Sequence, residues 1–457
     1  MMNTKETLKR TIILMWSLLG IVILTGMYAY EWLAVLLGKY VWKVNLYFKG
    51  HILMIFVYAV LLFFFSSTFG GLKIGYLKPW DVFFSQIFAI VIVGVVSYFQ
   101  ISLMEVRLFM WDTMLYMIII QIIFAGIWTF LGNNLYRFFF PPRKLLLIYG
   151  DHPTEDIQRK FATRKDKYDI VKLVYMGEDE AELYQEMLSK DYDGVVLWDI
   201  PATVRNKMLK YLYAHNVRVY MSPKISDVII KGSSPIHLFD TPIFLTREYS
   251  LKVEQRFAKR CIDIICSLIL AVVTSPIMLI TAIIIKCYDG GPVLYKQIRC
   301  TTGGKEFKIM KFRSMIVDAE KNSGAVLAKK NDSRITPIGK FIRAVRIDEL
   351  PQLFNILVGD MSFIGPRPER PEIIKQYMED MPEFAFRMKV KAGLAGYAQV
   401  YGKYNTTPYD KLKLDLSYIE NYSVWLDIKL MLLTLKILLS PEATEGVDSN
   451  QTTAAKK

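Results

Sequence analysis

Four long apolar stretches near the N-terminus constrain the fold of this chain most strongly. They cover approximately residues 11–30, 52–69, 81–101 and 113–131. Each stretch approaches the ~20 apolar residues that an α-helix needs to cross a bilayer. The sequence therefore predicts a membrane protein with a four-helix transmembrane bundle over residues 1–140.

Positive residues flank these four stretches. They are Lys5, Lys9 and Arg10 before the first stretch, and Arg137, Arg143 and Lys144 after the fourth. Four crossings return the chain to its starting side, and positive flanks favour the cytoplasm. Lys39, Lys43 and Lys49 in the first expected external loop oppose this orientation. We expect both ends of the bundle to lie inside the cell.

The composition and the net charge indicate which kinds of binding partner to expect. Apolar residues make up 53% of the chain, and the formal net charge is +14. Excess positive charge in a membrane protein suits anionic lipid headgroups or bound phosphates. The basic residues form no long run, and no DNA- or RNA-binding pattern occurs, so we expect membrane lipid and no nucleic acid as a partner. The four cysteines form no CxxC pair, which argues against a zinc or redox site.

Residues 141–250 predict a soluble, Rossmann-like α/β domain. Four short apolar runs read as buried strands: LLLIYG (145–150), IVKLVYM (170–176), GVVLWD (194–199) and VRVYM (217–221). Charged, helix-prone segments separate them, which is typical of a parallel sheet. No GxGxxG follows Gly150. A structural or dimerising role is therefore favoured over a dinucleotide site, and the sequence is compatible with a homodimer.

A fifth apolar segment, residues 262–285, is interrupted by Ser275 and Pro276. Proline removes a helical hydrogen bond, and a serine hydroxyl can satisfy the freed carbonyl at membrane depth. Basic residues precede the segment, ending at Arg260, and Lys286 follows it. Positive charge at both ends favours a re-entrant helix that bends and returns to the same face. A fifth full crossing is the alternative.

Residues 291–315, GPVLYKQIRCTTGGKEFKIMKFRSM, predict a β-hairpin. Apolar and polar residues alternate on both sides of a Thr-Thr-Gly-Gly turn. We expect Lys311 and Arg313 to project from one strand face, where two cations could grip a diphosphate. A solvated basic strand is the alternative.

The stretch VRIDELPQLFN, residues 345–355, places Asp348 beside Glu349. We expect Asp348 to cap an α-helix, whose dipole would keep the carboxylate ionised, as a nucleophile must be. Glu349 could hold Mg²⁺, and Arg343 and Arg346 could neutralise phosphate oxygens. The alternative is a capped helix with a surface Arg346–Glu349 pair, which contributes little stability.

A proline-rich loop follows. In GDMSFIGPRPERPE, residues 359–372, Pro366 and Pro368 hold Arg367 between two fixed φ angles. Such a loop can offer a guanidinium to a nucleotide, or it can be a stiff connector. Residues 424–439 suit an interfacial helix, and the polar tail 441–457 is expected to be disordered.

These motifs together resemble the bacterial sugar transferases, in particular the long-form monotopic polyprenyl-phosphate phosphoglycosyl transferases. The resemblance spans about residues 254–439. Its motifs are KR..D (259–263), the Ser275-Pro276 break, GPVLYKQ, GKEFKIMKFRSM, DELPQLFN, GDMSFIGPRP and GYAQVYGK.

The resemblance implies an α/β catalytic domain over residues 251–440, at the cytoplasmic face of the bacterial inner membrane. Such an enzyme transfers sugar 1-phosphate from a UDP-sugar to undecaprenyl phosphate, using Mg²⁺, at the start of exopolysaccharide or capsule synthesis. The resemblance implies that Asp348 is the nucleophile and that Glu349 is its magnesium-associated partner. It implies that Arg343 and Arg367 contact phosphate or nucleotide, and that Pro366 and Pro368 shape the loop of Arg367. Ser275 and Pro276 correspond to the break in the re-entrant helix.

The sequence leaves open the identity of the sugar and two alternative functions. Residues 389–404 depart from the family pattern at Ala392 and Ala395, so the sequence does not identify the sugar. A membrane scaffold with an inactive transferase-like domain is one alternative. A polytopic enzyme without a covalent intermediate is another, and it would have to use Asp81 and Asp112 in the N-terminal loops.

Overall fold

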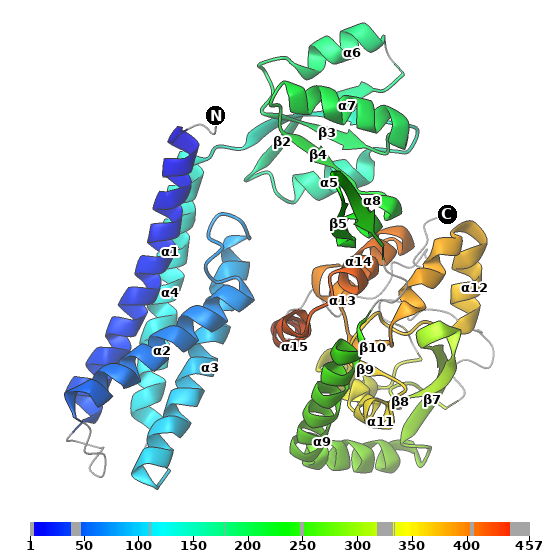
Figure 1. The fold of residues 1–457 in the computed structure, drawn as a ribbon. Coiled ribbons are helices and arrows are strands. Elements are labelled where there is room, and N and C mark those ends of the chain that lie inside the picture. Colours follow the sequence, from blue (N-terminus) through cyan, green and yellow to red (C-terminus); the bar gives the residue numbers. More distant parts are fainter. Residues whose placement is uncertain are drawn as a thin grey trace. The chain divides into compact units, whose positions relative to one another are not determined.

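The chain forms two compact units, Met1–Ser222 and Pro223–Lys457 (Figure 1). The computed structural model describes residues 4–37, 47–108, 111–177, 179–246, 251–317, 332, 334–402 and 406–438. The predicted disordered tail, 441–457, and two of the loop lysines, Lys39 and Lys43, lie outside these residues.

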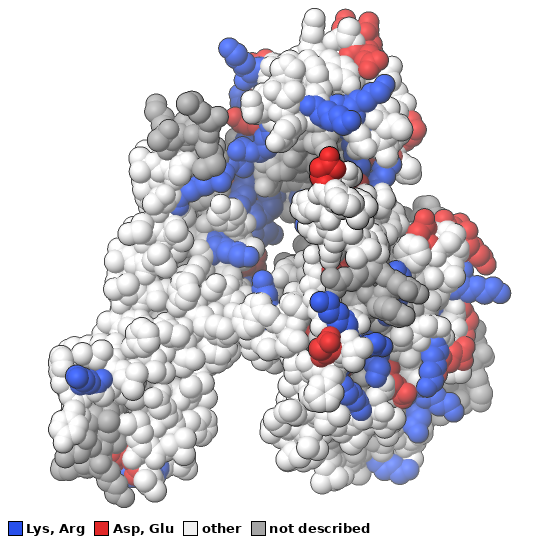
Figure 2. Space-filling view, in the orientation of Figure 1, with Lys and Arg blue, Asp and Glu red and all other residues white. Residues whose placement is uncertain are grey.

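Four long helices form the first part of the N-terminal unit. They are α1 (Thr4–Tyr30, continued by the π-helical turn η1, Glu31–Leu36), α2 (Phe48–Phe69), α3 (Pro79–Glu105) and α4 (Trp111–Phe139). Helices α1 and α3 each pack against both α2 and α4. On the face that Figure 2 shows, their surface is nearly free of charged side chains. The four predicted helices are confirmed, and each is long and apolar enough to cross a membrane.

A four-stranded parallel sheet forms the rest of this unit. Its strands are β1 (Arg143–Tyr149), β2 (Tyr168–Tyr175), β3 (Gly194–Trp198) and β4 (Val219–Met221), in the order β2-β1-β3-β4. Helices α5 (Glu155–Ala162), α6 (Glu180–Met187) and α7 (Ala202–Ala214) alternate with them. Side chains of β1 alternate between two cores, one containing Leu146 and the other Leu147. A sheet buried on both faces is typical of parallel strands, so the predicted α/β arrangement is confirmed.

The division between the units differs from the expected boundary at residues 250 and 251. Helix α8 (Ile225–Gly232) and the antiparallel pair β5 (Ser234–Leu238) and β6 (Thr241–Leu245) belong to the second unit. Helix α8 packs on α14 (Pro408–Glu420). Its Val228 lies in a core shared with Leu416 and Tyr418. Burial of this apolar residue assigns the segment to the C-terminal part.

Helix α9 (Val253–Asp289) contains the predicted break at Pro276. The Ser275 hydroxyl donates to the carbonyl of Val272 at 2.8 Å. That carbonyl is the one that the Pro276 nitrogen cannot bond, because proline has no N–H. Figure 1 shows α9 bending into two arms. The expected compensation by serine is confirmed, whereas the path of α9 through the membrane stays a prediction.

The second unit continues with a two-stranded hairpin. Strands β7 (Leu294–Cys300) and β8 (Glu306–Phe312) pair antiparallel, as predicted, around the 3-10 turn η2 (Thr302–Gly304), where Gly303 and Gly304 have positive φ. The elements that follow are α10 (Pro337–Ala344), η3 (Ile347–Glu349), α11 (Gln352–Val358), β9 (Ser362–Ile364), α12 (Pro371–Asp380), η4 (Pro382–Lys389), β10 (Gly393–Ala395), α13 (Tyr397–Tyr401), α14 and α15 (Val424–Leu438). Strands β9 and β10 pair parallel.

Buried polar contacts fix α9 to this unit. The Lys259 ammonium donates to the Ile364 carbonyl at 2.8 Å and to Asp427 at 2.7 Å. Asp263 accepts from the hydroxyl of Ser362, the first residue of β9. Arg260 donates to the carbonyls of Ile356 and Leu357, at the C-terminal end of α11. The KR..D motif therefore joins the apolar helix to β9 and α11.

Replacement of Lys259 by methionine tests this anchor. The side chains of Lys259 and Asp427 are 7% and 4% exposed. Removing one partner leaves the other charge buried, so Lys259→Met should lower the free energy of unfolding by about 3–5 kcal/mol. Thermal unfolding in detergent measures the effect. Lys375→Met on α12, where the lysine is exposed, is the control and should change stability by less than about 0.5 kcal/mol. Equal melting temperatures for the two variants would contradict the assignment.

Candidate active site

Asp348 lies in the tight turn η3, after Arg346 in a left-handed conformation with φ 59°. Helix α11 begins only at Gln352, after Pro351, and has seven residues. The expectation that Asp348 caps an α-helix is therefore wrong. The ionisation of Asp348 has to be explained by the charges around it.

Glu349 is the centre of an ion cluster. Its Oε1 accepts from Arg367 at 2.7 Å, with Lys311 at 3.4 Å and Arg346 at 3.8 Å. Burial alone would raise the pKa of Glu349, but the charges of these three cations outweigh burial and hold the pKa well below its usual range. The Arg346–Glu349 pair of the alternative interpretation is thus formed, but as part of a partly buried cluster, in which these two side chains are 31% and 13% exposed.

Asp348 is buried beside this cluster but has no such pairing. Burial, and then the charge of Glu349, raise its pKa to about 6, while Lys311, Arg343 and Arg346 act in the opposite direction. Its Oδ1 is buried and receives no hydrogen bond. A buried acceptor without a donor typically costs about 1–3 kcal/mol. Asp348 is therefore a mostly ionised carboxylate at neutral pH with one buried oxygen to which no described residue donates.

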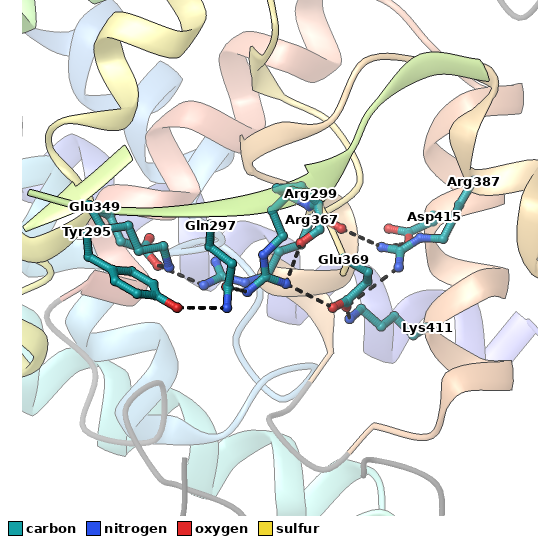
Figure 3. A network of polar contacts seen from close by, with 11 residues as sticks. Tyr295, Gln297, Arg299, Glu349, Arg367, Glu369, Arg387, Lys411 and Asp415 are labelled. Carbon is teal, nitrogen blue, oxygen red and sulfur yellow. Dashed lines mark hydrogen bonds and ion pairs between the residues drawn. The ribbon is translucent and has the colours of Figure 1, made fainter. Parts of the chain in front are cut away.

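The loop with Pro366 and Pro368 directs Arg367 toward Glu349, and a polar network supports it (Figure 3). Arg299 donates to the Pro368 carbonyl at 3.2 Å, and Arg387 to the Arg367 carbonyl at 3.0 Å. These contacts fix the backbone at Arg367 and at the residue directly after it. Hydrogen bonds to its carbonyls therefore restrain the proline loop, in addition to the fixed φ angles of its prolines.

Glu369 and Asp415 complete this support. Glu369 forms ion pairs with Arg299, Arg387 and Lys411. Burial would raise the pKa of Glu369, but Lys411 and Arg387 lower it to about 2. Asp415 pairs with Arg387 at 2.8 Å, and their side chains are 1% and 3% exposed. None of these supporting residues was predicted from the sequence as part of the site. Glu369 follows Pro368 directly, which was a usable signal, whereas Arg387 and Asp415 have no local signature.

Arg313 does not join the cluster. Lys311 reaches Glu349 as described, but β8 ends at Phe312, and the Arg313 guanidinium pairs with Asp289 and donates to the Pro292 carbonyl at 2.7 Å. The structure thus does not bring Lys311 and Arg313 together as a two-cation grip. Arg313 instead holds the C-terminal end of α9 against the start of the hairpin.

The cluster can accommodate a divalent cation only together with a ligand. In the part of the chain that the structure describes, no three or more His, Cys, Asp or Glu side chains converge. Mg²⁺ commonly uses one or two carboxylates, with water and substrate phosphates completing its shell. The adjacent carboxylates of Asp348 and Glu349, with the unpaired Oδ1, fit that requirement.

The opposite environments of the two carboxylates predict opposite effects on stability. The folded-state pKa of Asp348 is raised from 3.8 to about 6, so its contribution is favourable below pH 3.8 and is lost as the pH rises through 6. Asp348→Asn should therefore raise the melting temperature at pH 7.5, and the gain should shrink at pH 4.

Glu349→Gln is the matched variant for this prediction. The pKa of Glu349 is lowered, so its stabilising contribution is present above its unfolded-state pKa. Glu349→Gln leaves the three surrounding cations without their partner and should lower the melting temperature at pH 7.5. Thermal unfolding of both variants in one buffer series measures the contrast. Shifts of the same sign would contradict the proposed charge arrangement.

Known proteins are similar to this chain over its C-terminal part. A profile of the family described as Bacterial sugar transferase matches residues 254–441. A UDP-N-acetylgalactosamine-undecaprenyl-phosphate N-acetylgalactosaminephosphotransferase from Aeromonas hydrophila is 43% identical over 187 residues, covering 40% of this chain and 44% of that protein. A UDP-glucose:undecaprenyl-phosphate glucose-1-phosphate transferase from Klebsiella pneumoniae is 36% identical over 248 residues, covering 53% and 51%.

These two matches span about half the length of each relative. A protein from Caulobacter vibrioides with the same name as the Klebsiella enzyme is 37% identical over 189 residues, which cover 40% of this chain and 70% of that protein. The matched region contains the hairpin, the Asp348-Glu349 turn and the proline loop. The chain belongs to the bacterial sugar transferase family.

Proposed function

We propose that this protein transfers a sugar 1-phosphate from a UDP-sugar to undecaprenyl phosphate, forming undecaprenyl-diphosphate-sugar and UMP. The observation that carries the proposal is the buried, unpaired Oδ1 of Asp348 beside a cation-rich cluster. Lys311, Arg343, Arg346 and Arg367 outnumber the two carboxylates. Such an excess of positive charge attracts a diphosphate. In a bacterium, this reaction would start exopolysaccharide or capsule synthesis.

In the first step, an Asp348 carboxylate oxygen attacks the sugar-bound phosphorus of the UDP-sugar. A new P–O bond forms to Asp348, and the P–O bond to the bridging oxygen breaks. UMP leaves with that oxygen and its electron pair. An aspartyl-phosphosugar intermediate remains, in line with the two-step logic of covalent catalysis. The paired Glu349 stays ionised and keeps Arg367 and Lys311 directed at the diphosphate.

In the second step, a phosphate oxygen of undecaprenyl phosphate attacks the same phosphorus. The bond to Asp348 breaks, and the carboxylate is regenerated without net uptake or release of a proton by the enzyme. Guanidinium groups can neutralise charge on the phosphoryl oxygens during both transfers. Arg367 is fixed for this task by the network behind its loop.

Mg²⁺ is part of the proposal. Glu349, with the adjacent Asp348, would hold the ion, which when bound would offset negative charge on the diphosphate. Only one oxygen of Glu349 is used by Arg367 and Lys311, since both contacts involve Oε1. The carboxylate therefore keeps an oxygen outside those two contacts.

The membrane location that we propose for the site rests on α9. Its bend and its basic flanks support a re-entrant path with both ends at the cytoplasmic face of the bacterial inner membrane. A cytosolic UDP-sugar could then meet a lipid-embedded acceptor. The relatives are named for N-acetylgalactosamine and for glucose, so the donor is proposed as a UDP-hexose or a UDP-N-acetylhexosamine, without a choice between them.

UMP release tests the reaction directly. Purified protein with Mg²⁺, undecaprenyl phosphate and a panel of UDP-sugars should release UMP from at least one of them. Asp348→Asn should abolish release because the amide is a poor nucleophile, although it keeps the side-chain shape. Lys375→Met, on the exposed face of α12, should retain wild-type release. Full activity of Asp348→Asn would exclude Asp348 as the nucleophile.

Cysteine accessibility tests the path of α9. The four native cysteines are first replaced by serine. Single cysteines are then introduced by Phe257→Cys and Tyr288→Cys, at exposed positions near the two ends of α9. A membrane-impermeant reagent should label both from the cytoplasmic side. Leu108→Cys, exposed between α3 and α4, is the control and should be labelled from outside. Labelling of the two α9 ends from opposite sides would show a full crossing.

A further inference from the structure

Gln352 carries a buried donor that the fold leaves unused. It is the first residue of α11, is 3% exposed, and its Nε2 has no acceptor. Buried polar groups in native proteins almost always have a partner. Asn355, one turn later on the same helix, shows the usual arrangement. Its carboxamide accepts from the Met310 nitrogen at 3.0 Å and donates to the Lys308 carbonyl at 2.9 Å.

The position of Gln352 follows from its neighbours along the chain. Asn355 places one face of α11 against the backbone of β8. Glu349, on the other side of Gln352 in sequence, contacts Lys311 of the same strand. Residues three apart on one helix share a face, so Gln352 lies on the same face of α11 as Asn355, the face that contacts β8. In the sequence, Gln352 thus lies between the Asn355 and Glu349 contacts with this strand.

A second buried atom without a partner belongs to the turn η3. The Oδ1 of Asp348, four residues before Gln352, is a buried acceptor without a donor. These two atoms are complementary in kind, yet they are not bonded to each other. A phosphoryl group bound to Asp348 would serve both, since its phosphorus would bond the carboxylate and one of its oxygens could accept from Gln352.

We propose that Gln352 is a further catalytic residue, whose Nε2–H binds a non-bridging oxygen of the phosphoryl group that Asp348 takes up. This assignment rests on the proposed function. It gives the transferring phosphoryl group a neutral donor in addition to the cations. A fixed donor directed at developing charge lowers the barrier, because it needs no reorganisation during the reaction.

Gln352→Met tests the assignment, because methionine keeps the length and approximate volume of the side chain but removes the donor. The kcat of UMP release should fall by about 100-fold, the loss typical of removing one such donor. The melting temperature should stay the same or rise, because a buried unpaired group has been removed. Asn355→Leu is the matched contrast, and it should lower the melting temperature because two satisfied hydrogen bonds are lost.

Inorganic diphosphate provides a second readout that does not require turnover. With Mg²⁺, it should raise the melting temperature of the wild-type protein more than that of Gln352→Met. An equal shift in both proteins, or a kcat within twofold of wild type, would overturn the assignment. A fall in melting temperature like that of Asn355→Leu would also overturn it, since Gln352 would then be structural. If the wild-type protein released no UMP from any UDP-sugar, the proposed function would fail, and the diphosphate comparison would still decide whether Gln352 binds phosphate.

Discussion

The ion pair between Glu349 and Arg367 is the contact on which the site depends. It joins the turn that carries Asp348 to the proline loop, and Lys311 adds the hairpin to the same carboxylate. Because the cations surround Glu349, its pKa is lowered, while the pKa of its neighbour Asp348 is raised. Two adjacent carboxylates with pKa values pushed apart can take different roles. In the mechanism that we propose, Glu349 holds the cations and an Asp348 oxygen attacks the phosphorus.

This arrangement is connected to the apolar helix α9 by short links. Arg260 of α9 binds the last carbonyls of α11, and α11 begins three residues after Glu349. Lys259 of α9 binds the end of β9, which leads into the proline loop. Both halves of the cluster are thus tied to one helix. Because α9 is long and apolar enough to cross a membrane, these links connect the site to a candidate membrane helix.

Features with a local cause were predictable from the sequence. The lengths of the apolar stretches predicted the four helices, and the alternation of apolar and polar residues predicted the hairpin. Ser275 lies within one helical turn of the carbonyl that Pro276 leaves unbonded, so its role was also predictable. Features that depend on contacts between residues far apart in the sequence were not predictable. The preference of Asp348 for a helix cap amounts to about 1 kcal/mol, and the surrounding tertiary contacts outweigh it. The pairings of Arg313 with Asp289 and of Arg387 with Asp415 join residues far apart in sequence, so no local pattern indicates them.

Mass spectrometry of the protein after incubation with a UDP-sugar and Mg²⁺, without a lipid acceptor, tests the central claim most directly. If Asp348 is the nucleophile, a phosphosugar adduct should form on the peptide that contains Asp348. The adduct should disappear when undecaprenyl phosphate is added. UMP release with an adduct on a different residue, or turnover in which the Asp348 peptide is never modified, would contradict this claim.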